Sequence, residues 1–203
     1  MGDADSTIDF SVPAITLAEA LLGCELLRVE SDGALTGGVV VETEAYPGGD
    51  DLASHSAGGR RTNRNASMYL AGGHLYVYLI YGVHHCLNVV SGSSDSGEAV
   101  LVRSLRPTHG LHRMRERRGG RSDRDLARGP GRLCAALGID RGLDGGFLGS
   151  ACGVIIRPGV RPESIVQAPR VGVDYAGAWA GRRWRFLCGA QSDWSSRPRG
   201  LEC

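Results

Sequence analysis

Acidic, imidazole and phenol side chains lie close together between residues 41 and 88 of this 203-residue chain. Glu42, Glu44 and Tyr46 share one short segment, His55 follows them, and the aromatic run 75–82 comes next. This mixture suits an enzyme that stacks a flat ring between aromatic side chains and activates a water molecule beside it. Removal of a nucleobase from DNA is chemistry of this kind.

The two glutamates lie on a predicted strand. Residues 39–46 alternate, which places Glu42, Glu44 and Tyr46 on one face. Such a face is too polar for a core, and we expect it to form a cleft wall. Because cleavage of an N-glycosidic bond develops positive charge on the sugar, one of the glutamates could activate water and stabilise that charge. Paired glutamates on an exposed strand are more often solvated or salt-bridged, so only the neighbouring aromatic residues favour catalysis.

Four tyrosines supply the aromatic faces. Tyr46 and Tyr78 are candidates for stacking on an extruded base, a contact worth about 1–3 kcal/mol per base. Tyr81 stands beside a glycine at a predicted turn, where a bulky side chain could fill the gap left in the duplex. For Tyr76 we expect ordinary strand packing. His55 would by itself be a surface-loop histidine, and its position after Glu44 and Tyr46 makes it a candidate.

Composition excludes several kinds of chemistry. All 23 basic residues are arginine, so apart from the N-terminal amine no group can form a Schiff base. The six cysteines are scattered without C-x-x-C pairs, which favours reduced core thiols. His84 and His85 are adjacent on a predicted strand and point to opposite faces, which disfavours a shared metal ion. We therefore expect no metal and no cofactor.

Turn and capping signals predict short helices and strands. A helix is expected to begin at Thr16, with Glu19 closing a capping box, and to end at Gly23. A strand over 99–105 is expected to stop at Pro107. The other predicted elements are strands at 75–81, 86–90, 154–157 and 184–188, a loop at 47–67, and helices at 111–118 and 133–137. The residues 128–132 before the last helix could hold a phosphate at its N-terminus.

Length and hydrophobic content predict one domain. With 42% hydrophobic residues the chain can bury a core, and we expect a flexible segment at residues 1–12 followed by a single domain at 13–203. The net charge is +1, but arginines crowd residues 103–132 and could leave one basic face. A signal peptide and an apolar run of roughly 18 residues are both missing, which predicts a cytoplasmic protein with no membrane partner.

Several motifs, in order along the chain, together resemble the alkyladenine (3-methyladenine) DNA glycosylase family. The resemblance covers roughly residues 14–188. The matching segments are Glu42-Thr43-Glu44-Ala45-Tyr46, His55-Ser56, Gly58-Gly59-Arg60, Arg64-Asn65, Leu75–Gly82, Cys86-Leu87-Asn88, Leu101-Val102-Arg103, Gly129–Cys134 and Arg170–Val173.

The resemblance implies a monofunctional enzyme that flips a damaged purine out of duplex DNA and hydrolyses its glycosidic bond. It implies an α+β fold: one compact domain around a curved, mostly antiparallel sheet, with flanking helices and a projecting β-hairpin. It also implies a monomer that acts on double-stranded DNA containing damaged purines, associated with the bacterial nucleoid.

The resemblance assigns roles to particular residues. Glu44 matches the general base, with Arg103 and the backbone of Val171 helping to position the attacking water. The residues that hold the extruded base or exclude normal purines are Tyr46, His55, Tyr78 and Asn88. Those expected to contact DNA are Tyr81 as the intercalating wedge, with Arg60, Thr62, Val83, Arg132 and Gly172.

Two other functions fit some of the same residues. A nucleoside hydrolase could use Glu42 and Glu44 as a carboxylate pair and would need no wedge at Tyr81. A non-catalytic module could bind damaged DNA through the aromatic residues alone, and loss of Glu44 would then change nothing.

Overall fold

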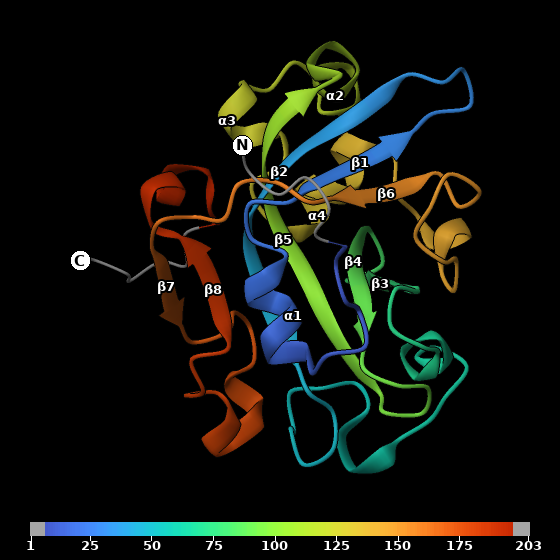
Figure 1. The fold of residues 1–203 in the computed structure, drawn as a ribbon, viewed down its shortest axis with the longest axis vertical. Coiled ribbons are helices and arrows are strands. Elements are labelled where there is room, and N and C mark those ends of the chain that lie inside the picture. Colours follow the sequence, from blue (N-terminus) through green and yellow to red (C-terminus); the bar gives the residue numbers. More distant parts are fainter. Residues whose placement is uncertain (1–6, 197–203) are drawn as a thin grey trace.

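A curved antiparallel sheet runs through the molecule and carries most of the predicted site residues (Figure 1). The computed structural model describes residues 7–196. The strand order is β3-β4-β5-β2-β1-β6, and β8 pairs with both β2 and β7. The strands are β1 Glu25–Val29, β2 Leu35–Tyr46, β3 Leu75–Ile80, β4 His84–Ser91, β5 Glu98–His109, β6 Val154–Arg157, β7 Ile165–Ala168 and β8 Arg185–Cys188. The predicted α+β fold around a curved antiparallel sheet is confirmed.

Short helices pack against this sheet. In Figure 1, α1 lies in front of β5, and the main core joins α1 and α4 to the sheet through residues such as Leu17, Val102 and Leu133. The helices are α1 Ala14–Ala20, α2 Leu111–Arg117, α3 Asp123–Leu126 and α4 Pro130–Leu137, with 3-10 turns η1 Ala57–Gly59, η2 Ala66–Tyr69, η3 Arg141–Leu143, η4 Asp174–Trp179 and η5 Gly189–Trp194. Within residues 7–196, none of these helices has the length and apolar character needed to span a membrane.

The start of α1 differs from the prediction. The helix begins at Ala14, directly after Pro13, so Thr16 lies inside it and the predicted capping box does not form. The Ala14 N–H instead donates to the Glu98 carboxylate, at 2.8 Å. A side chain from β5 therefore caps the helix, because any buried or half-buried N–H at a helix start needs an acceptor, local or distant.

The prediction that Pro107 ends its strand is also wrong. β5 continues to His109, and Pro107 pairs with Gly38 of β2. Because β4 pairs with β5 only at residues 98–101, this end of β5 needs no donor toward β4. Gly38 permits the close approach, since a Cβ there would lie 2.1 Å from the Arg106 carbonyl oxygen.

The acidic part of β2 is buried rather than exposed. Glu42 and Glu44 have fully enclosed side chains, and β2 is covered on its two edges by β5 and β8 at this point. The pairing with β5 shifts register on both sides of Glu42. Each carboxylate has an arginine partner: Glu42 pairs with Arg103 and Arg185, and Glu44 pairs with Arg103. Such pairing offsets the cost of removing acids from water.

Part of the segment expected to be flexible falls within the described residues. Ile8, Phe10 and Val12 pack against the main core. The Phe10 carbonyl accepts from the Gly92 N–H at 3.0 Å, which ties the segment to the end of β4. Residues 1–6 lie outside the described part of the chain.

Candidate active site

A cavity of about 220 Å³ opens where β2, the β3–β4 hairpin and the loop before η4 meet. This volume is below the roughly 300–1,000 Å³ of pockets for drug-sized ligands, so it fits one small flat group. Among the residues predicted from the sequence, its lining contains Tyr46, His55, Tyr78, Tyr81, Asn88, Arg103, Val171 and Gly172. The fold thus gathers segments that are far apart in the chain.

Glu44 lies directly behind this lining. Its Oε1 accepts from the Val171 backbone N–H at 2.7 Å, and its Oε2 accepts from the Tyr46 hydroxyl at 2.8 Å. Arg103 Nη1 is 3.2 Å from the same Oε2. Three residues that line the cavity therefore fix one buried carboxylate. Two of them, Arg103 and Val171, were predicted to act with Glu44, whereas Tyr46 was predicted to contact the extruded base.

Arg103 keeps its charge in this enclosed place. Burial by itself would lower the pKa of its guanidinium, but Glu44 and then Glu42 more than offset this and raise the pKa above its usual value. The Tyr46 hydroxyl has its pKa raised well above the usual range by burial and by the Glu44 charge. Tyr46 is therefore a neutral hydrogen-bond donor to Glu44 near neutral pH.

Aromatic rings form another wall of the cavity. The His55 and Tyr78 rings meet edge to face, with centroids 4.7 Å apart. His55 Nδ1 lies 2.8 Å from the hydroxyl of Tyr76, which is buried in the core beneath. Burial, helped by Arg64 and Arg60, lowers the pKa of His55, so its ring is neutral at pH 7.

Asn88 closes the cavity from β4. It is almost fully buried, and its side-chain Nδ2 donates to the Tyr76 carbonyl oxygen at 2.9 Å. This bond fixes the amide orientation and leaves the remaining polar edge of Asn88 available at the cavity wall.

The tip of the β3–β4 hairpin lies at the edge of the cavity and is mostly exposed. Tyr81 is 85% exposed and Val83 is 70% exposed. Tyr81 and Gly82 both have positive φ, 53° and 71°, and the Val83 N–H donates back to the Ile80 carbonyl at 3.3 Å. Tyrosine is strained in this left-handed conformation, a feature found at functional positions in other proteins.

The other residues predicted to contact DNA are more dispersed. Arg60 and Thr62 line a neighbouring cavity of about 540 Å³, which shares His55 and Tyr175 with the first. Arg132 lies on α4, with half of its side chain exposed and its Nη1 3.5 Å from Asp125. Pro130, at the start of the same helix, lines the first cavity.

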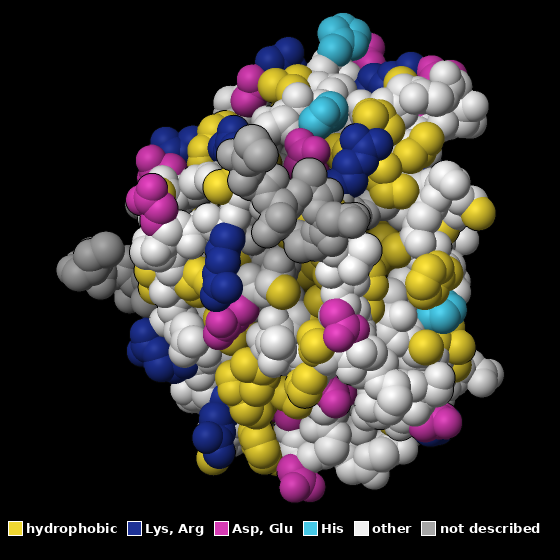
Figure 2. All heavy atoms as spheres, viewed as in Figure 1, with side chains coloured by type: hydrophobic (Ala, Val, Ile, Leu, Met, Phe, Trp, Pro, Cys, Tyr) yellow, Lys and Arg dark blue, Asp and Glu magenta, His cyan; other side chains and the backbone are white. Residues whose placement is uncertain are grey.

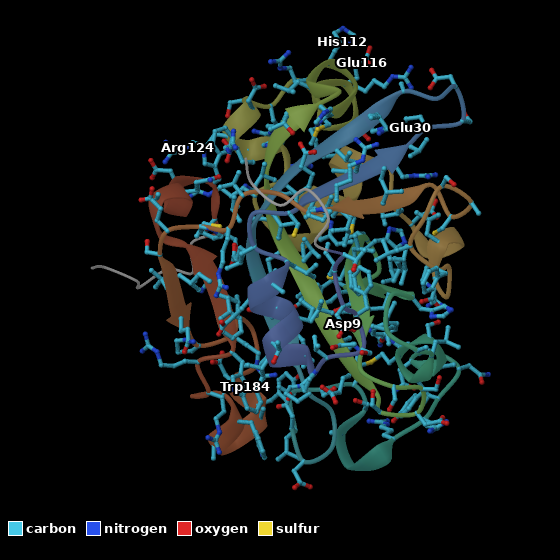
Figure 3. All side chains as sticks on the ribbon, in the orientation of Figure 1. Asp9, Glu30, His112, Glu116, Arg124 and Trp184 are labelled. Carbon is cyan, nitrogen blue, oxygen red and sulfur yellow. The ribbon has the colours of Figure 1, made fainter. Side chains whose placement is uncertain are left out.

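Several arginines of the stretch predicted to leave a basic face are paired with acids. Arg117 donates to both oxygens of Glu30, each at 2.9 Å, and Arg115 likewise pairs with Asp123. Figure 3 shows Glu30 near α2 and Arg124 on α3. On the face drawn in Figure 2, basic and acidic side chains are interspersed. Acids within the stretch, such as Asp123, and acids from other segments, such as Glu30, therefore offset part of its positive charge.

Comparisons with known proteins agree with this geometry. The model of the methylpurine-DNA glycosylase family matches residues 8–192. The chain belongs to this family. A "DNA-3-methyladenine glycosylase" of Mus musculus is 45% identical over 87% of this chain and 56% of its own length. A "Probable DNA-3-methyladenine glycosylase" of Encephalitozoon cuniculi is 44% identical over 88% of this chain and 86% of its own length. A "Putative 3-methyladenine DNA glycosylase" of Myxococcus xanthus is 47% identical over 87% of this chain and 86% of its own length. The chain thus spans about half the length of the mouse relative and most of the other two.

In this methylpurine-DNA glycosylase family member, one ion pair supports the site in a way that the sequence did not indicate. Arg170 Nη1 and Nη2 donate to the two oxygens of Asp51 at 2.6 and 2.7 Å, and both side chains are almost fully buried. The Arg170 guanidinium also lies 4.8 Å from the Tyr46 ring centroid and 5.0 Å from that of Trp184, which is labelled in Figure 3. Arg170 precedes Val171, so this pair anchors the loop whose N–H reaches Glu44.

The cavity also contains residues that sequence reasoning missed. Tyr175 is 71% exposed and lines both cavities, and its hydroxyl lies 3.4 Å from the Ala53 carbonyl oxygen. Met68, Ile80 and Leu101 add apolar surface to the lining. Ile80 and Leu101 lie in segments that match the family motifs but were given no role, and the signal for Met68 and Tyr175 was their closeness in the chain to predicted site residues.

Proposed function

We propose that this chain is a monofunctional DNA glycosylase that removes damaged purines, alkylated or deaminated, from duplex DNA and leaves an abasic site. The observation that carries the proposal is the buried Glu44 carboxylate, held by Arg103, Tyr46 and the Val171 N–H behind an aromatic cavity. The membership of the family supports it.

The proposed reaction is hydrolysis at C1′ of the damaged nucleotide. Glu44 accepts a proton from a water molecule while the water oxygen bonds to C1′, and the electron pair of the glycosidic bond leaves with the base. The negative charge of Glu44 also stabilises the positive charge that develops on the sugar. Arg103 and the Val171 backbone orient the water. Because the chain has no lysine, water is the natural nucleophile, and no strand cleavage follows from a Schiff base.

In this proposal the cavity holds a base that has been flipped out of the helix. Tyr46, His55 and Tyr78 contact the base, and the neutral His55 ring offers one acceptor or donor to its edge. Asn88 disfavours undamaged purines by crowding an exocyclic amino group. The cavity volume of about 220 Å³ is of the size expected for a small group such as one base.

The hairpin tip is proposed to enter the duplex. Tyr81 fills the gap left by the flipped base, with Val83 beside it, and Arg60, Thr62, Arg132 and Gly172 contact the DNA backbone. We propose that the protein acts as a monomer, in the cytoplasm, on duplex DNA that contains damaged purines.

Single-turnover excision tests this proposal. A duplex with one hypoxanthine or one ethenoadenine is incubated with excess enzyme, and alkali then converts abasic sites into strand breaks. We expect the wild type to yield breaks and Glu44→Gln to lose about 10²- to 10⁴-fold in rate while still binding the duplex. Glu116→Gln, the same change on an exposed part of α2, is the matched control and keeps the full rate.

The same experiment separates the two alternatives. If the wild type binds these duplexes and methylated DNA but cuts none of them, the chain is a damage-binding module. If it instead hydrolyses free nucleosides and Tyr81→Ala leaves that rate unchanged, with no action on duplex DNA, it is a nucleoside hydrolase.

A further inference from the structure

Glu42, two residues before the proposed base, occupies a different environment from Glu44. Both acids are fully buried, but Glu44 is held by three residues that line the cavity, whereas Arg103 is the one cavity-lining residue among the partners of Glu42 within residues 7–196. The Oε1 of Glu42 accepts from Arg103 Nε at 2.8 Å and from Arg185 Nε at 2.7 Å, and its Oε2 accepts from the Ser104 hydroxyl at 2.9 Å. Glu42 therefore holds the edge of the Arg103 guanidinium that faces away from Glu44.

Ser196, in the segment after η5, completes this arrangement. Its N–H donates to Glu42 Oε2 at 2.6 Å, and its hydroxyl donates to Glu42 Oε1 at 2.8 Å. The same hydroxyl accepts from Arg103 Nη2 at 3.1 Å, and the Ser196 carbonyl accepts from Arg185 Nη2 at 2.7 Å. One serine thus contacts the acid and both arginines.

The cluster balances its charges and occupies all three nitrogens of Arg103. Glu42 and Glu44 carry two negative charges, and Arg103 and Arg185 carry two positive ones, so the buried group is neutral. Arg103 directs Nε to Glu42, Nη2 to Ser196 and Nη1 to Glu44. A guanidinium held at two nitrogens by fixed partners has little freedom to rotate its third away from Glu44.

Burial alone would raise the pKa of Glu42, but Arg103, Arg185 and Ser196 together lower it below its usual value. The acid is therefore ionised at neutral pH and can hold both arginines.

We propose that Ser196 and Glu42 are positioning residues for catalysis: they hold the Arg103 guanidinium so that its Nη1 stays on Glu44 and on the attacking water. The inference rests on the proposed glycosylase function. It extends the active site to a segment that follows Glu42 by 154 positions in the chain.

The chain offers a matched pair of serines for the test. Ser196→Ala removes a hydroxyl that touches Glu42 and Arg103. Ser195→Ala removes a neighbouring hydroxyl that is buried and has no hydrogen-bond partner among residues 7–196. Glu42→Gln is the more direct change, but it leaves the arginines in excess in a buried cluster and endangers folding. The serine pair avoids this difficulty.

We expect Ser196→Ala to lower the single-turnover rate constant on a hypoxanthine duplex on the order of tenfold, since each tenfold step corresponds to about 1.4 kcal/mol of barrier. The dissociation constant for the duplex and the amplitude of the reaction should remain those of the wild type. Ser196→Thr, which keeps a hydroxyl, should recover most of the rate, and Ser195→Ala should match the wild type.

Three outcomes would overturn the inference. An unchanged rate constant in Ser196→Ala would show that Arg103 needs no such support. A fall only in amplitude or in melting temperature would show that Ser196 stabilises the fold without positioning Arg103. An equal loss in Ser195→Ala would show that the effect is not specific. If the wild type itself fails to excise the base, the proposed function fails together with this inference, whereas an active wild type separates the two.

Discussion

The floor of the cavity and the tip of the β3–β4 hairpin are built in opposite ways. Around the floor, Glu44, Arg103 and the Asp51–Arg170 pair are buried and hydrogen-bonded. At the tip, Tyr81 and Val83 are mostly exposed. Groups that act on a reacting atom must be fixed before the substrate arrives. A side chain that is to insert into a binding partner must instead make few contacts with the rest of its own protein, so that it stays accessible.

The largest effect is expected from breaking the floor. Asp51→Asn removes one charge of the buried pair and leaves Arg170 without its counter-ion. We expect a loss of about 3–5 kcal/mol in the free energy of unfolding, because an uncompensated buried charge is costly. Urea unfolding measures it.

The exposed Arg61–Asp95 pair provides the control for this change. Its side chains are 55% and 70% exposed. Asp95→Asn should therefore cost only about 0–1 kcal/mol, and asparagine tolerates the positive φ of 71° at this position. Equal losses in the two variants would contradict the distinction between buried and exposed pairs.

An intermediate effect is expected from changes at the hairpin tip, where one substitution should raise the free energy of unfolding and lower the rate of excision. Tyr81→Gly relieves the left-handed strain and should raise the free energy of unfolding by up to about 1 kcal/mol. It should lower duplex excision by on the order of tenfold, because it removes an aromatic contact worth about 1–3 kcal/mol. Thermal unfolding and single-turnover excision measure the two quantities.

Tyr81→Ala separates the backbone from the side chain. It removes the ring but keeps a Cβ in the strained conformation, so it should lose activity without gaining stability. A stability gain of equal size in Tyr81→Ala would mean that exposure of the ring, and not the backbone strain, is the unfavourable term.

The smallest effect is expected from the protonation of His55 in the cavity wall as the pH falls. His55 has a folded pKa below its usual 6.5, so the unfolded chain takes up the proton first as the pH falls. The contribution of His55 is therefore fully present above about pH 6.5 and declines below it, by at most about 1.4 kcal/mol per pH unit.

Urea unfolding at pH 7.5 and pH 5.5 checks this dependence. His55→Gln should show a smaller fall in stability between the two values than the wild type, whereas Tyr81→Ala should show the same fall. An unchanged difference in His55→Gln would assign the acid sensitivity between these two pH values to groups other than His55.

Local signals predicted the elements well where the neighbours agreed with them. The predicted turn at Tyr81-Gly82 and the helix end at residue 138 form as expected, and Gly82 and Gly138 have the positive φ that glycine favours. The predictions failed at Thr16 and Pro107, where Glu98 of β5 caps a helix and an unpaired strand edge accepts a proline. At Thr16, a distant residue supplies the acceptor that the predicted cap would have provided. At Pro107, no neighbouring strand requires the N–H that proline lacks.

The sequence by itself determined the kinds of groups in the site and their family. The alternation of residues 39–46, the tyrosine run and the absence of lysine were compatible with base removal by water, and the ordered motifs that resemble the alkyladenine DNA glycosylase family favoured it over the alternatives. The tertiary structure alone decided that Glu42 and Glu44 have separate partners, that Asp51 binds Arg170 across 119 positions, and that Ser196 reaches Arg103. Such contacts depend on how the strands and loops are brought together, and no local pattern of residues encodes that arrangement.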